Sequence, residues 1–108
     1  MKQIRIKING NYYNIIEKEC VFPENKAEIS YSDREIRISP KYLFHPKGLH
    51  LVIHEITHAY IYETQITPPP YSEESVCEFM SIYGSEIINV SKTVYRKLKQ
   101  NSLQNNLD

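Results

Sequence analysis

Two histidines and a glutamate lie within five residues of one another near the middle of the chain, at His54, Glu55 and His58. Residues four apart lie one turn apart on the same face of a helix, so the two imidazoles can bind one tetrahedral zinc ion. Glu55 is offset by one position and lies beside the metal, where its carboxylate can take a proton from a metal-bound water. This HExxH spacing therefore predicts a zinc-dependent hydrolytic site.

The motif lies in a segment whose apolar residues predict a helix independently of the motif. After Gly48, apolar side chains recur at spacings of three and four residues as far as Tyr60, and the prolines 68–70 end the pattern. We expect a helix of about four turns that ends near Thr64. Two ionisable rings in so apolar a helix need a partner to offset their desolvation, and a metal ion provides one. The alternative is a surface helix with two structural histidines.

A catalytic zinc site usually has three protein ligands and a water, so a third ligand is required. Glu74 and Glu78 follow the proline turn and are themselves one helical turn apart. Equal distances from the turn favour Glu78, because it lies about as far into the second helix as His58 lies from the end of the first. A second helix that begins at Pro70 would favour Glu74 instead. Spacing alone leaves both candidates open.

The N-terminal third alternates apolar and polar residues, which is typical of half-buried strands. The segments with this alternation are 4–8, 12–16, 27–31 and 35–39, and the turn dipeptide Asn9-Gly10 joins the first two. A second helical stripe begins at Ser72 and continues to the region of Leu98. We therefore expect an α+β fold, in which a small, mostly antiparallel sheet packs on the motif helix and on a long C-terminal helix.

The composition is typical of one globular domain, which we place at residues 1–100, with a polar tail at 101–108 that we expect to fray. Lys plus Arg equal Asp plus Glu at 13 each, so no net charge attracts nucleic acid, and we do not expect nucleic-acid binding. Cys20 and Cys77 are too few for a disulfide scaffold or a four-cysteine zinc site.

The chain has no apolar run of membrane-spanning length, and its first residues lack the apolar stretch of a secretion signal. We therefore expect a cytoplasmic protein that does not bind membranes. The sequence does not predict its oligomeric state.

The run HEITHAY from His54 to Tyr60, followed by an acidic helix, resembles the compact gluzincin zinc metallopeptidases. It looks most like the small bacterial and phage proteins of the ImmA/IrrE type, over about residues 47–90. In that group a ligand Glu is followed by two variable residues, a small residue and a polar side chain. Residues Glu74 to Glu78 fit this order, with Cys77 as the small residue. The resemblance implies a minimal zincin-like fold with Glu74 as the third zinc ligand and Glu78 as a partner that orients a ligating imidazole.

Together these residues predict a zinc-dependent peptidase that acts on a peptide or protein substrate with Glu55 as general base. The alternative is a regulatory or binding module that retains the zinc site without significant turnover. Four tyrosines fall near the motif, and one of them could donate a hydrogen bond to the developing oxyanion. They are Tyr60, Tyr62, Tyr71 and Tyr83, and the sequence does not say which one would act.

Overall fold

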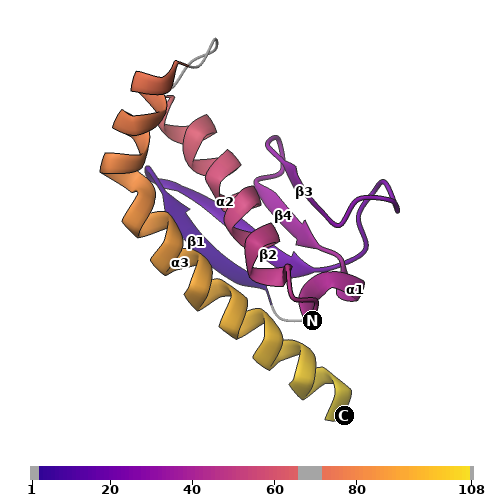
Figure 1. Ribbon diagram of the computed structural model, residues 1–108. Helices are drawn as coiled ribbons and strands as arrows, with labels where there is room; N and C mark the ends of the chain where they lie inside the picture. Colours follow the sequence, from indigo (N-terminus) through magenta and orange to yellow (C-terminus); the bar gives the residue numbers. More distant parts are fainter. Residues whose placement is uncertain (1–2, 66–71, 108) are drawn as a thin grey trace.

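The computed structural model describes residues 3–65 and 72–107, and within them the chain forms four strands followed by three helices (Figure 1). The strands are β1 (Ile4–Ile8), β2 (Asn11–Glu17), β3 (Ala27–Ser30) and β4 (Glu35–Ile38). The helices are α1 (Pro40–Leu43), α2 (Gly48–Thr64) and α3 (Glu73–Leu107). The predicted α+β class is confirmed, because the N-terminal sheet packs on the motif helix and on a long second helix.

The four strands form one mixed sheet in the order β1-β2-β4-β3. β1 pairs with β2 and β3 pairs with β4 in antiparallel fashion, as the sequence predicts, but the central strands β2 and β4 run parallel. Local alternation does not reveal this parallel pair, because it reports only which face of the sheet each side chain takes. Asn9 and Gly10 have φ of 49° and 86° at the first turn, and a two-residue turn with positive φ suits the twist of a hairpin.

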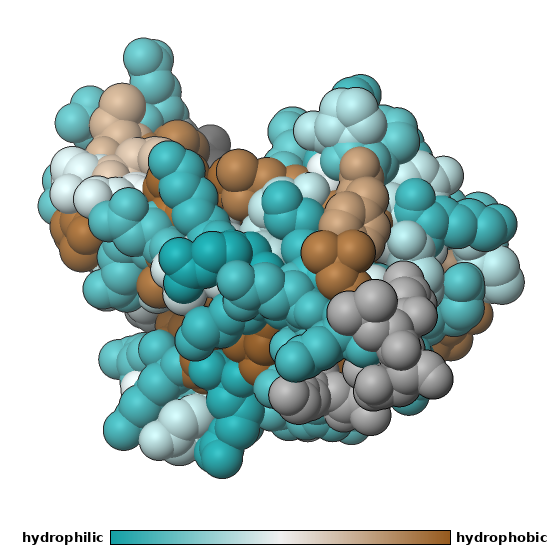
Figure 2. Space-filling view, turned by 90° about the horizontal axis from the view of Figure 1, so that it is seen from below, coloured by the Kyte–Doolittle hydropathy of each residue, from teal (hydrophilic) through white to brown (hydrophobic). Residues whose placement is uncertain are grey.

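The core lies between the inner face of the sheet and the two long helices. Isoleucines alternate along β1 and β4, so one set of side chains in each strand points toward the helices and is largely removed from water. The buried apolar side chains include members from the sheet (Ile8, Ile15, Ile36, Ile38), from α2 (Val52, Ile56, Ala59) and from α3 (Phe79, Ile87, Val94, Leu98). Figure 2 looks at the lower end of the molecule and shows a mostly hydrophilic surface with small, separate apolar patches.

The helices α2 and α3 run antiparallel beside one another (Figure 1). Near the end of α2, the hydroxyl of Tyr60 donates to Glu86 Oε2 at 2.6 Å, and before the start of α2 the hydroxyl of Tyr95 donates to the carbonyl of Leu43 at 2.8 Å. A Cβ at Gly48 would lie 2.6 Å from the Tyr95 hydroxyl oxygen and 2.5 Å from the Leu43 carbonyl oxygen. Only glycine allows this close approach, so the start of α2 is fixed against α3.

Two helical regions differ from the expectation. Pro40 occupies the first position of the short helix α1, where its fixed φ suits a helix and its missing N–H costs nothing. The sequence pattern, which alternates up to Ser39, did not predict this helix. At the other end, α3 remains helical to Leu107, beyond Asn101, where fraying was expected. The alternative start of the second helix at Pro70 lies outside the described residues.

Glu63, in the last turn of α2, joins that helix to both hairpins of the sheet. Its side chain is 5% exposed and accepts hydrogen bonds from Asn11 Nδ2 at 2.6 Å, Tyr13 OH at 2.9 Å and Arg34 Nε at 3.0 Å. Asn9 Nδ2 donates to the main-chain carbonyl of Glu63 at 2.9 Å. Burial acts to raise the pKa of Glu63, but the hydrogen bonds from Tyr13, Arg34 and Asn11 outweigh it and hold the pKa below its ordinary value.

Replacing Glu63 by alanine should lower the free energy of unfolding by about 2–3 kcal/mol at neutral pH, because three buried or half-buried donors lose their acceptor. Urea denaturation measures this, with Glu78→Ala as the control because Glu78 is an exposed helical glutamate. The pKa of Glu63 is lowered on folding, so its contribution is present above the ordinary carboxyl pKa and is lost as the pH falls. If the difference in unfolding free energy between wild type and Glu63→Ala stayed constant as the pH fell below the ordinary carboxyl pKa, this role would be contradicted.

Candidate metal centre

His54 and His58 project side by side from the exposed face of α2. Their Nε2 atoms lie 3.2 Å apart, and their ring planes are inclined by 77°. Two nitrogens that bind one tetrahedral zinc ion at about 2.0–2.1 Å are about 3.3 Å apart. The pair therefore has the separation that zinc requires, although a hydrogen bond between the two rings has a similar length.

The protonation of His58 also suits a metal ligand. Burial lowers the pKa of His58, and the neighbouring His54 lowers it further, because two imidazolium charges repel at this distance. Neutral imidazole is the form that binds a metal ion. The lowered pKa of His58 therefore favours the form of this ring that can bind a cation at neutral pH.

Glu55 lies on the buried side of α2 and is 7% exposed. Burial raises the pKa of its carboxyl group to about 7, and the carboxylate of Glu28 on β3 adds to the effect. Its Oε2 atom is buried and has no hydrogen-bond partner among the described residues. A carboxyl group with a pKa near neutral pH can both accept and donate a proton under physiological conditions. The motif thus combines two exposed imidazoles with one desolvated carboxyl group.

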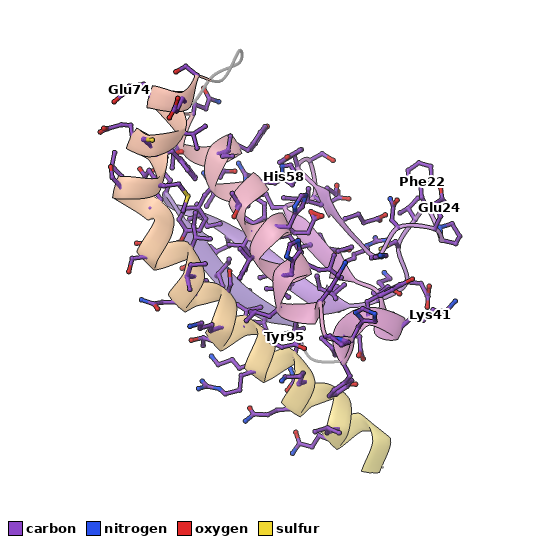
Figure 3. All side chains as sticks on the ribbon, viewed as in Figure 1. Phe22, Glu24, Lys41, His58, Glu74 and Tyr95 are labelled. Atoms are coloured by element: carbon purple, nitrogen blue, oxygen red, sulfur yellow. The ribbon has the colours of Figure 1, made fainter. Side chains whose placement is uncertain are left out.

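The structure does not bring Glu74 or Glu78 to the histidine pair. Both side chains are exposed, and Figure 3 shows Glu74 at the N-terminal end of α3 while His58 projects from the middle of α2. Phe79 is buried, so Glu78, about 100° before it around the helix, is turned toward solvent. Within residues 3–65 and 72–107, no three His, Cys, Asp or Glu side chains are close enough to hold one metal ion. Both assignments of a third ligand therefore remain predictions.

The histidine pair occupies an open hollow of about 310 Å³ on the outward face of α2. The residues that line it recur at helical spacing: His50, Ile53, His54, Thr57, His58 and Ile61. Helix periodicity from His54 could have identified all of them. Glu28 carries no such signal, because β3 is brought to α2 only by tertiary packing. A hollow lined by a single helix leaves the two histidines accessible from solvent.

The tyrosines near the motif take different places. Tyr60 and Tyr83 pack against one another with ring centroids 5.8 Å apart, and the hydroxyl of Tyr60 is already bonded to a glutamate of α3. Tyr62 is half-exposed and stacks on Tyr31 of the β3–β4 turn at 4.5 Å between centroids. Tyr71 lies outside the described residues. Of the described candidates Tyr62 is the most exposed, but none of Tyr60, Tyr62 and Tyr83 lines the hollow at the histidine pair.

No family model, curated protein sequence or solved structure matches this chain. The resemblance to the ImmA/IrrE-type gluzincins consequently rests on the HExxH residues and on the order of residues from Glu74 to Glu78. In the described part of the chain, no helix has both the length and the apolar character to cross a membrane.

Glu55→Gln should change how the stability of the metal-free protein depends on pH. Because folding raises the pKa of Glu55 to about 7, its favourable contribution is complete below the ordinary carboxyl pKa and is lost as the pH rises toward 7. Wild-type protein should lose about 2–3 kcal/mol of unfolding free energy relative to Glu55→Gln over this interval. Urea denaturation in the presence of a chelator measures the difference. Parallel pH profiles for the two proteins would show that the carboxyl group is not desolvated.

Proposed function

We propose that the protein is a zinc-dependent peptidase in which His54 and His58 hold the metal ion and Glu55 acts as the general base. The observation that carries the proposal is the approach of two imidazole nitrogens to 3.2 Å beside a buried carboxyl group with a pKa of about 7. The histidine pair supplies the donors that zinc prefers. The carboxyl group supplies proton transfer at neutral pH.

The residues of the chain have separate roles in this reaction. Bound at the pair, zinc would supply Lewis acidity that polarises the scissile carbonyl and makes a water molecule more acidic. Glu55 would take a proton from the attacking water and then deliver it to the leaving amine. Burial suits both steps, because it makes the carboxylate a stronger base and allows its acid form to persist near neutral pH. The open hollow along α2 gives a polypeptide access to the site.

The second candidate is a regulatory or binding module that holds zinc without significant turnover. Two observations favour it. The described residues contribute two histidine ligands without a third carboxylate beside them, and Glu55 Oε2 is enclosed rather than exposed to the hollow. Such a site would still bind a metal ion, but its base would not reach a water molecule.

Glu55→Gln separates the two candidates when zinc content and peptide hydrolysis are measured together. For a peptidase, the variant should retain the zinc content of wild type while kcat/KM falls at least about 100-fold, because proton transfer to the base is lost. His58→Ala is the control and should lose zinc. Undiminished hydrolysis by Glu55→Gln would reject the mechanism. Zinc binding by wild type without hydrolysis of a diverse peptide library would favour the module.

Glu74→Ala should lower zinc affinity more than Glu78→Ala, if the resemblance assigns the third ligand correctly. A lost carboxylate ligand removes a charged bond to the metal, whereas a lost partner of a ligand typically costs about 10–100-fold. Competition with a chromogenic chelator measures both, with His58→Ala as the reference for a lost ligand. For Glu74 to bind, the start of α3 would have to lie closer to the histidines than it does here. Unchanged affinity in both variants would place the third ligand elsewhere.

A further inference from the structure

A second groove, of about 300 Å³, lies between β1 and α3, and no residue of α2 lines it. Three consecutive residues of β1, Ile4, Arg5 and Ile6, contribute to its wall. Successive side chains of a strand point to opposite faces of a sheet, so a groove that touches three in a row must follow the edge of the strand. Figure 1 shows β1 as the outermost strand on the side of α3.

The edge of β1 is open to a further strand. β1 is the first strand in the sheet order and pairs only with β2. The main-chain groups on its other side therefore have no strand partner within the described residues. An edge of this kind is a template for an added strand, and several peptide-binding proteins use it in this way. The helix α3 runs alongside without filling the space.

The lining of the groove is apolar at its base and cationic at its rim. Ile4 and Val94 are buried at the base, while Arg5 and Lys97 are exposed at the rim. Neither cation has a carboxylate partner among the described residues; the guanidinium of Arg5 lies 4.0 Å from the ring centre of Tyr12. Within residues 3–65 and 72–107, no acidic side chain lines the groove. The surface is therefore complementary to a chain segment that carries both apolar and acidic side chains.

We propose that this groove binds an extended, acidic segment of a partner protein, which adds as a strand to the edge of β1. Main-chain hydrogen bonds would fix its register, and alternate side chains would contact the apolar base. Acidic side chains would meet Arg5 and Lys97. A second copy of this chain fits poorly, because pairing two β1 edges brings like charges together. The site is independent of the histidine pair, which lies on α2.

The test is binding of a short, dye-labelled peptide of alternating Glu and Val to the full chain, followed by fluorescence anisotropy. The same peptide with Lys in place of Glu should bind at least about tenfold more weakly, because its charges match those of the rim. Two further versions carry N-methyl groups on odd or on even residues. One of them should lose binding, since strand addition needs the amide donors on one side of the peptide.

Lys97→Glu and Lys92→Glu form a matched pair of variants, because both lysines are exposed on α3 and only Lys97 lines the groove. The two changes alter the net charge equally. Lys97→Glu should lower the affinity for the Glu-Val peptide by about tenfold, while the affinity of Lys92→Glu should stay within about twofold of wild type. Equal losses of affinity in the two variants would overturn the proposal, and so would a failure of the Glu-Val peptide to bind. Equal affinities for the Lys-Val and Glu-Val peptides, or unchanged binding of both N-methylated peptides, would overturn it as well.

Discussion

The position of α2 on the sheet depends on the buried carboxylate of Glu63. Three backbone positions with positive φ surround it, although none of them is glycine: Asn9 at 49°, Arg34 at 48° and Gln65 at 50°. Asn9 and Arg34 each donate a hydrogen bond to Glu63, and Gln65 caps the helix that carries it. A left-handed residue other than glycine costs roughly 1–2 kcal/mol. The hydrogen bonds to Glu63 offset this cost at the two turns and fix the hairpins against the end of α2.

Because both ends of α2 are fixed, the side chains that face the sheet and those that face solvent are fixed as well. Gly48 lies against Tyr95 at its start, and Glu63 is bonded to the sheet at its end. The residues between them then follow from the helical repeat of about 100° per residue. Glu55 faces the sheet and is desolvated, whereas His54, one position earlier, remains exposed. A single helix thereby presents two imidazole rings to solvent and holds a carboxyl group in a less polar environment.

The rotation of α3 about its axis turns the glutamates near its start toward solvent, whereas α2 turns Glu55 toward the sheet. Its apolar stripe is set by packing against the sheet and α2, with Phe79 and Ile87 turned inward. Glu74 and Glu78 are consequently on the exposed surface. The same rotation places Lys97 beside the free edge of β1. One helix therefore carries exposed acidic residues in its first two turns and, nearer its C-terminal end, a lysine that lines the groove beside β1.

The sequence by itself determined the elements whose cause lies within a few residues. Alternation of apolar and polar residues predicts the strands, Asn9-Gly10 predicts the first turn, and apolar spacing predicts α2 with His54 and His58 on one face. These features depend on backbone preferences and on the helical or strand period, which neighbouring residues specify. A spacing of four residues was therefore enough to predict that the two imidazoles meet.

Only the tertiary structure decided which distant segments meet. The parallel pairing of β2 with β4, the approach of Glu28 to Glu55 and the hydrogen bonds of Glu63 to residues 29 to 54 positions away have no local signature. The exposure of Glu74 belongs with these features, because the direction of its side chain depends on how α3 rotates to bury its apolar stripe. Burial of a common core settles these choices, and it involves residues from every layer at once.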